Sequence, residues 1–274
     1  MKQLFSNPLA LTGFVLISLM LVLALLAPWL APYDPDAIQV KDILLSPSAN
    51  HWMGTDGLGR DVWSRMLFGG RISLLVGLVA VGISTAIGII LGAIAGYYRG
   101  WVDTVIMRLV DIMLSIPSFF LILAVIAFLS PSITNVMIVI GLTSWMGVTR
   151  LVRAEFLSLT QREFVLASAA LGARDWRIIF KHCLPNSLTP VLVSVVLGIA
   201  SAVLLESGLS FLGLGVQAPQ ASWGNILTDG KEYIQFAWWL SLFPGLAILI
   251  TVLGYNLLGE GLRELFDPRS TNSR

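Results

Sequence analysis

Residues 72–96 read ISLLVGLVAVGISTAIGIILGAIAG, a stretch of 25 residues without a charged side chain. An α-helix rises about 1.5 Å per residue, so about 20 apolar residues cross the roughly 30 Å hydrocarbon core of a bilayer. This stretch is long enough to do so. It therefore predicts a membrane-spanning helix.

Five further windows of similar hydrophobicity accompany this stretch. Across the whole chain 56% of the residues are hydrophobic and 12% are charged, whereas an average soluble domain has roughly 25% charged residues. So little charge cannot cover a water-exposed surface, but a bilayer can cover apolar helices. We therefore expect an all-α polytopic membrane protein with about six transmembrane helices, at roughly Leu9–Leu30, Ile72–Gly96, Val105–Ala127, Ile133–Val148, Leu188–Leu205 and Trp239–Leu258.

The first window resembles a secretory signal peptide in its position but not in its length. It exceeds the roughly 7–15-residue apolar core of such a peptide. It also ends at Pro28, Trp29 and Pro32, as a membrane exit with an interfacial aromatic residue does. We expect it to stay in the mature protein as an anchor.

The basic residues predict the topology. With the N-terminus inside, 12 of the 17 Lys and Arg fall on the cytoplasmic side, so the positive-inside rule places both termini in the cytoplasm. The net charge of +1 gives no electrostatic footprint for nucleic acid. We divide the chain into an N-terminal anchor helix with an outer loop, 1–71, and a core of five transmembrane helices, 72–274, which includes a long cytoplasmic loop at about 149–187.

Catalytic chemistry cannot be assembled from this sequence. It contains no G-x-x-x-x-G-K-[ST] phosphate loop and no G-x-S-x-G or H-E-x-x-H signature. Cys183 is a single cysteine, and His51 and His182 fall on opposite sides of the membrane in the predicted topology. We therefore expect no enzyme, no metal site and no cofactor in this chain. The chain also lacks an internal repeat, so the second half of an alternating-access transporter would have to come from another chain.

The cytoplasmic loop predicts a helix-turn-helix. Small residues favour a short helix that Gly172 can end with a positive φ. Asp175 then starts a second short helix, and Pro185 marks its end. An apolar stripe at Trp176, Ile179 and Phe180 fits either a groove on a soluble partner or the lipid headgroups.

Charged residues within the spans are candidates for function. Arg108 and Asp111, at i and i+3, predict an intramembrane ion pair in the third span. Glu206, at the outer end of the fifth span with Ser207 and Ser210, is a candidate for the translocation path, although a solvated interfacial carboxylate is the alternative. We also expect Pro117 to kink the third span, and Pro244 is a candidate for the same effect in the sixth.

The loop from Ala167 to Pro185 resembles one found in permease subunits of binding-protein-dependent ABC importers. The family pattern is E-A-A, three residues, Gly, nine residues, then I-x-L-P. Ala167, Gly172, Leu184 and Pro185 match it at the correct spacing. Leu166, Ser168 and His182 depart from it.

Three further stretches resemble one branch of that family, the second permease of peptide and nickel importers. They are the outer-loop stretch His51–Leu74, the fifth-span exit Ser207–Gly215 and the C-terminal stretch Asn256–Pro268. The resemblance implies a type I ABC importer permease fold in a bacterial cytoplasmic membrane. It also implies a second, different permease, an extracytoplasmic solute-binding protein and two cytoplasmic ATPase subunits that bind ATP and Mg.

The resemblance further implies which residues meet the ATPase subunits, in a coupling loop formed by Ala167, Ser168, Leu171, Gly172, Ala173, Arg174 and Asp175. Arg60 and Asp61 in the outer loop either contact the solute-binding protein or order the loop itself. The substrate stays open between peptides, nickel and other small solutes. A self-sufficient secondary transporter or channel is the main alternative, and a membrane-embedded enzyme is the second.

Overall fold

The computed structural model describes residues 7–130 and 132–266. That part of the chain is helical and contains no β-strand, only a single antiparallel bridge between Thr55 and Asp61. The helices, in chain order, are α2 (Pro8–Leu25), α3 (Ala27–Leu30), the 3₁₀ turn η1 (Val40–Asp42), α4 (Val62–Tyr98), α5 (Gly100–Leu114), α6 (Ser118–Ala127), α7 (Ile133–Leu142), α8 (Met146–Leu159), α9 (Glu163–Ala170), α10 (Asp175–Arg177), the π-helix η2 (Ile178–Cys183), α11 (Leu184–Phe211), α12 (Trp223–Lys231) and α13 (Trp239–Phe266).

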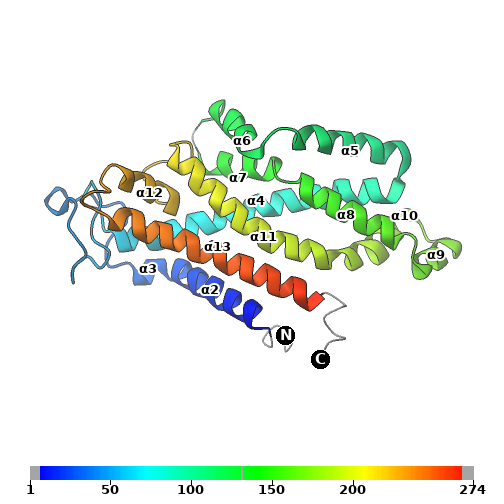
Figure 1. Cartoon of the computed structure of the whole chain (residues 1–274), viewed down its shortest axis with the longest axis horizontal. Coiled ribbons are helices and arrows are strands. Elements are labelled where there is room, and N and C mark those ends of the chain that lie inside the picture. Colours follow the sequence, from blue (N-terminus) through cyan, green and yellow to red (C-terminus); the bar gives the residue numbers. More distant parts are fainter. Residues whose placement is uncertain (1–6, 131, 267–274) are drawn as a thin grey trace.

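The long helices α2, α4, α11 and α13 run along the long axis of the molecule (Figure 1). One end, named the outer end after the predicted topology, carries α12 and the loop between α3 and α4. The opposite end carries α9 and α10, which together with the turn between them form the elbow, Glu163–Arg177. Helix α2 begins and α13 ends on the side that faces the elbow.

The helices confirm a polytopic membrane protein. Five segments are long and apolar enough to cross a bilayer: Pro8–Leu25, Val62–Tyr98, Ile133–Leu159, Asp175–Phe211 and Trp239–Phe266. The number rises to six, as predicted, when the bent pair α5 and α6 is counted as one span.

The predicted third span, Val105–Ala127, is broken. Helices α5 and α6 meet at 82°. The break lies at Ser115–Pro117, and Pro117 precedes the first residue of α6. Proline has no amide hydrogen to donate and its ring clashes with the carbonyl four residues earlier. The predicted kink at Pro117 is therefore confirmed, and it divides the predicted span into the two helices α5 and α6. Pro244, by contrast, lies inside the single helix α13.

Helix α4 starts ten residues before the predicted span. Asp61 caps it, with its carboxylate accepting a hydrogen bond from the amide of Ser64 at 2.8 Å. The 37 residues of α4 span about 55 Å at 1.5 Å per residue, so the helix extends beyond the hydrocarbon core. It also runs unbroken through residues 71 and 72. The predicted division between residues 71 and 72 therefore falls inside one helix.

The predicted cytoplasmic loop at 149–187 is also mostly helical. Its first residues belong to α8, which continues to Leu159. At its other end, α10, η2 and α11 form one segment, Asp175–Phe211. Pro185 does not end a helix but lies in the first turn of α11, directly after the π-helix η2. The non-helical connection is thereby reduced to a few residues on each side of α9.

Small residues allow α4 to approach α8 closely. Gly88, Gly92 and Gly96 follow one another at four-residue spacing along α4. A Cβ at Gly92 would lie 2.6 Å from the carbonyl oxygen of Thr149 and 2.7 Å from the Cβ of Val152. Apolar lipid gives little driving force for helix association, so close van der Waals contact between small residues supplies it.

The same kind of contact holds α2 to the core. A Cβ at Gly13 would lie 2.4 Å from the amide nitrogen of Leu258 and 2.6 Å from the carbonyl oxygen of Gly254. One turn further along α13, a Cβ at Gly261 would lie 2.5 Å from the amide nitrogen of Ala10. The N-terminal anchor therefore packs as an integral part of the helical bundle.

Candidate functional site

The elbow is a helix ended by a glycine, as the sequence predicts. Gly172 has a φ of +80°. Its amide donates to the carbonyl of Ala169 at 2.9 Å, and the amide of Ala173 donates to the carbonyl of Ser168 at 3.1 Å. These two hydrogen bonds form a Schellman motif, which satisfies carbonyls at the end of α9. The chain then reverses and enters α10.

The tip of the elbow is uncovered. Leu171 is 89% exposed, and Ala167, Gly172, Arg174 and Asp175 are exposed as well. Exposed apolar residues mark an interaction surface where several of them lie together. Of the predicted coupling residues, only Ser168 and Ala173 are partly covered.

Two buried side chains anchor the elbow to the membrane helices. Val165 of α9 and Ile178 of η2 are each 4% exposed. They pack in one apolar cluster with Val152 and Phe156 of α8 and with Cys183. The elbow is therefore packed directly against α8.

Polar contacts add to this anchor. The hydroxyl of Tyr97, at the end of α4, donates to the Oδ1 of Asp175 at 2.9 Å. The hydroxyl of Ser168 lies 3.3 Å from the Nε2 of His182. The guanidinium of Arg99 donates to the Oγ1 of Thr160 at 2.7 Å. These contacts connect the elbow region to the ends of α4 and α8 and, through η2, to the start of α11.

Trp176 and Phe180 of the predicted apolar stripe are 64% and 61% exposed, as a surface for a soluble partner or for lipid headgroups requires. The helix that carries them is not a regular α-helix, because Ile178–Cys183 is a π-helix, in which hydrogen bonds span five residues. Trp176 and Phe180 thus add to the exposed apolar surface beside the tip.

The predicted ion pair between Arg108 and Asp111 is wrong. Asp111 accepts instead from the Nη2 of Arg150 in α8, at 2.5 Å. Arg108 is exposed, and no ion pair joins it to Asp111 within the described residues. The neighbouring helix explains the difference, because α8 also places Arg153 beside Asp103, with Nη2 to Oδ2 at 2.6 Å. These two ion pairs allow α8 to continue as a helix where hydropathy predicts a loop.

Glu206 is buried within this chain, so the alternative of a solvated interfacial carboxylate is wrong. It is 0% exposed and accepts from the hydroxyl of Ser73 at 3.2 Å and from that of Ser210 at 2.7 Å. The hydroxyl of Ser73 also accepts from the amide of Trp223 at 3.2 Å. Ser207 is buried too and donates to the carbonyl of Val203 at 2.8 Å. Glu206 thus joins α4, α11 and α12 at the outer end.

A cavity of about 210 Å³ opens between α4, α7, α8 and α11 in the middle of the bundle. Hydroxyl groups line it from several helices, and none of its lining residues is charged; the hydroxyl residues are Ser84, Thr85, Ser144, Ser194 and Ser201. The Oγ1 of Thr85 is buried and has no hydrogen-bond partner among the described residues. Sequence reasoning missed this cavity. Its only signal was the presence of serines and threonines within apolar spans.

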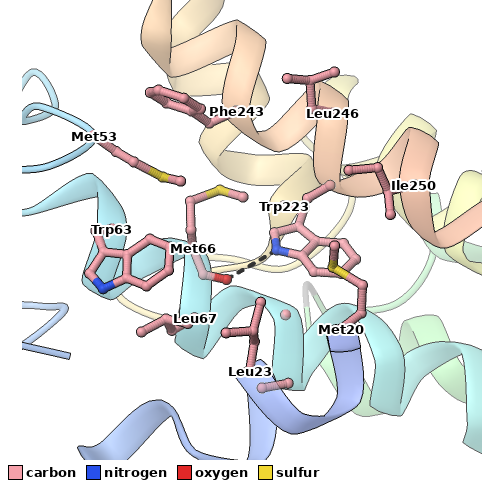
Figure 2. Close-up of a pocket in the computed structure, with 13 residues that line it drawn as sticks. Met20, Leu23, Met53, Trp63, Met66, Leu67, Trp223, Phe243, Leu246 and Ile250 are labelled. Carbon is pink, nitrogen blue, oxygen red and sulfur yellow. Dashed lines mark hydrogen bonds between the residues drawn. The ribbon is translucent and has the colours of Figure 1, made fainter. Parts of the chain in front are cut away.

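Figure 2 shows another cavity, of about 230 Å³, between α2, α4, α12 and α13. Met20, Trp63, Met66 and Trp223 line it with other apolar residues. The indole of Trp223 donates to the backbone carbonyl of Met66 at 3.0 Å, so its polar group is already satisfied. This cavity offers no polar group for recognition of a charged solute.

The outer loop is ordered by its own charges. Asp61 accepts from the hydroxyl of Ser64 at 2.7 Å, and its Oδ1 lies 2.9 Å from the Nδ1 of His51. Arg60 donates from Nε to the Oδ2 of Asp56 at 2.7 Å. All five side chains are buried. Of the two predicted roles for Arg60 and Asp61, the structure confirms the ordering of the loop.

The chain matches two protein-family models. Residues 88–272 match the binding-protein-dependent transport system inner membrane component, and residues 1–47 match the N-terminal transmembrane domain of oligopeptide transport permease C.

Several permease proteins are similar over nearly the whole chain. A dipeptide transport system permease protein from Alkalihalophilus pseudofirmus is 44% identical over 98% of this chain and 88% of its own length. A probable D,D-dipeptide transport system permease from Escherichia coli K12 is 45% identical over 98% of this chain and 90% of its own length. A di/tripeptide transport system permease from Pseudomonas aeruginosa is 43% identical over 97% of this chain and 90% of its own.

A solved structure shares the fold. It is a chain of the methionine ABC transporter MetNI in inward-facing conformations, with a TM-score of 0.59 and 19% sequence identity. The match covers 73% of this chain and 95% of the other.

Proposed function

Because this chain belongs to the family of binding-protein-dependent transport system inner membrane components, we propose that it forms one half of the membrane path through which an importer takes up short peptides. The chain is a permease subunit of an ATP-binding-cassette importer, a multi-pass protein of the inner membrane. ATPase subunits and a substrate-binding protein act with it in this type of importer.

Peptides are the substrate class that the relatives favour. Three permeases that resemble this chain carry names that refer to dipeptides, D,D-dipeptides or di- and tripeptides. The hydroxyl-lined cavity in the bundle agrees with this assignment, because neutral hydroxyls can hydrogen-bond to a peptide backbone without selecting the charge of its side chains. We therefore favour peptides over nickel.

The proposed partners follow from the fact that the sequence supplies only half of an alternating-access transporter. Without an internal repeat, we propose that a second, different permease completes the path. The ATP and Mg belong to the ATPase subunits, and this chain carries no cofactor and catalyses no reaction of its own. The start of α2 and the end of α13 lie toward the elbow. We therefore place the elbow and both termini in the cytoplasm.

The observation that carries the proposal is the exposed tip of the elbow on a buried anchor. Leu171 is 89% exposed, whereas Val165 and Ile178 on either side are 4% exposed. We propose that the tip sits in a groove of an ATPase subunit and that closure of the ATPases moves α8 and α11. Such a movement switches the bundle between inward-facing and outward-facing states.

Site-directed cross-linking tests this proposal. The native Cys183 is buried, so Leu171→Cys adds one accessible thiol at the tip. In membranes that contain the complete importer, we expect this thiol to cross-link to an ATPase subunit. Val40→Cys, in the outer loop and 75% exposed in the native chain, is the matched control and should not cross-link. A Leu171→Cys thiol that reacts only with reagents added outside the cell would refute the proposal.

A further inference from the structure

Two adjoining polar cavities lie at the outer end. One has a volume of about 280 Å³ and the other about 200 Å³. Both are lined by Leu58, Arg60, Thr228 and Asp229. They lie between the outer loop, the start of α4, and α12 with the segment that precedes it. The larger cavity also reaches Arg65 of α4.

Arg60 is fixed within this region. Its amide and its Nε donate to the two carboxylate oxygens of Asp56, at 2.9 Å and 2.7 Å. Its side chain is 8% exposed. Because these short contacts hold the Nε, the terminal nitrogens of the Arg60 guanidinium are left to face the cavities.

Arg65 is buried more deeply and held less well. Its side chain is 2% exposed, and its closest carboxylate oxygen, on Asp56, lies 3.4 Å from Nε. That contact lacks hydrogen-bond geometry, so the Nε is a buried donor without a hydrogen-bond partner among the described residues. Its Nη1 donates to the backbone carbonyl of Pro35 at 3.3 Å, and Asp36 lies 3.8 Å away. A buried donor without an acceptor costs free energy. The hydrogen-bonding capacity of the Arg65 guanidinium is therefore not saturated.

Asp229 now faces both guanidinium groups. Its Oδ2 lies 3.4 Å from the Nη2 of Arg60 and 3.9 Å from the Nη2 of Arg65. Hydrogen bonds between charged groups are usually about 2.7–2.9 Å long. The Asp229 side chain is 43% exposed, and partial burial raises the pKa of its carboxyl even though Arg65 and Arg60 act in the opposite direction. Asp229 is therefore a loosely held carboxylate on the short helix α12.

We propose that Arg60 and Arg65 form a carboxylate-binding site that receives the C-terminal carboxylate of the substrate peptide, and that Asp229 is an exchangeable occupant of this site. This inference rests on the proposed function in peptide import. Arginine suits the role because its planar fork of N–H donors matches a carboxylate. When the peptide carboxylate displaces Asp229, the carboxylate of Glu232, which lines the smaller cavity, can pair with the peptide ammonium.

Direct binding to the assembled importer tests the site. The complex in lipid nanodiscs, without ATP and without the solute-binding protein, is titrated with dialanine and with its C-terminal amide. Saturation-transfer NMR measures both affinities. We expect dialanine to bind about tenfold tighter than the amide, the effect of one hydrogen-bonded charge pair. Asp229→Asn, which removes the competing carboxylate charge, should increase the affinity for dialanine severalfold and leave that for the amide unchanged.

Substitutions of Arg65 distinguish a loss of carboxylate recognition from a loss of folding. Arg65→Gln should abolish the preference for the free carboxylate, and Arg65→Lys should restore it only in part. Either substitution of this buried arginine can impair assembly of the complex. In that case the Asp229→Asn variant, at a partly exposed position, decides the outcome. Asp34→Asn, an exposed change in the same loop, is the control and should bind as the wild type does.

Two results would overturn the inference. The first is equal affinity for dialanine and its amide in both the wild type and Asp229→Asn. The second is unchanged peptide binding in Asp229→Asn together with altered docking of the solute-binding protein, since the arginines would then serve an acidic surface of that protein. An importer that takes up dialanine with ATP but shows either result loses this site and keeps the proposed function. Failure of ATP-driven uptake would instead refute the proposed function.

Discussion

At the scale of single residues, Gly172 has a backbone conformation that favours glycine, and it lies in the turn of the elbow. Its φ is +80°, and a Cβ built there would meet nothing within 4 Å. Substitution is therefore limited by the backbone conformation alone. An L-residue with a side chain pays roughly 1–2 kcal/mol for a left-handed conformation.

Gly172→Ala is expected to lower ATP-driven uptake while the complex still assembles. A cost of 1–2 kcal/mol shifts the population of the native turn by about 5- to 30-fold, and the tip then presents Leu171 in a different direction. Uptake by proteoliposomes measures the effect. Gly245→Ala is the matched control, because that glycine also has open space around it but no positive φ. Equal losses in both variants would contradict a role for the turn.

Single residues differ in how much of their structural role can be predicted from the sequence. Gly172 was identified because one chemical property, tolerance of positive φ, can be read from its type. Glu206 and Asp111 could not be placed in the same way. Their partners, Ser73 and Arg150, lie far away in the sequence, and helical spacing describes only neighbours on one helix.

At the scale of helices, α4 is in close contact with α8 through Gly88, Gly92 and Gly96. We expect Gly92→Ala to destabilise the protein by about 1–3 kcal/mol, the usual cost of overpacking, because the new Cβ meets the Thr149 carbonyl at 2.6 Å. Thermal unfolding of the purified complex measures this. Gly82→Ala on the same helix, with nothing within 4 Å, should leave the melting temperature unchanged or slightly higher. An unchanged melting temperature for Gly92→Ala would show that α4 and α8 are further apart than described.

The two ion pairs between α5 and α8 should differ in strength. Asp103 and Arg153 have side chains that are 17% and 31% exposed, whereas Asp111 and Arg150 are 54% and 51% exposed. We expect Asp103→Ala to cost about 1.5–3 kcal/mol and Asp111→Ala less than about 1 kcal/mol. Thermal unfolding of the two variants compares them. A larger loss for Asp111→Ala would mean that this pair lies in hydrocarbon, where water does not screen it.

At the scale of the whole molecule, the hydroxyl-lined cavity should change its access during the transport cycle. In Ser194→Cys, we expect the rate of labelling by a membrane-impermeant thiol reagent to change severalfold between the nucleotide-free and the ATP-bound importer, because the bundle opens to opposite sides. Mass spectrometry of the labelled chain measures the rate. Leu78→Cys is the control, since Leu78 is 61% exposed on α4 and does not line the cavity; it should show no such change. Equal labelling of Ser194→Cys in both states would exclude this cavity from the path.

The amino-acid sequence was sufficient to predict the membrane class, the approximate positions of the spans, the kink at Pro117 and the glycine turn at 172. Each of these follows from a local property: the length of an apolar run, the missing amide hydrogen of proline, or the freedom of glycine. Tertiary structure alone decided the length of α8, the partners of Asp111 and Glu206, the burial of Ile178 and the pairing of Arg60 and Arg65 with Asp229. Those features depend on groups that folding brings together from distant parts of the chain, and the free energy of a buried charge is set by such neighbours.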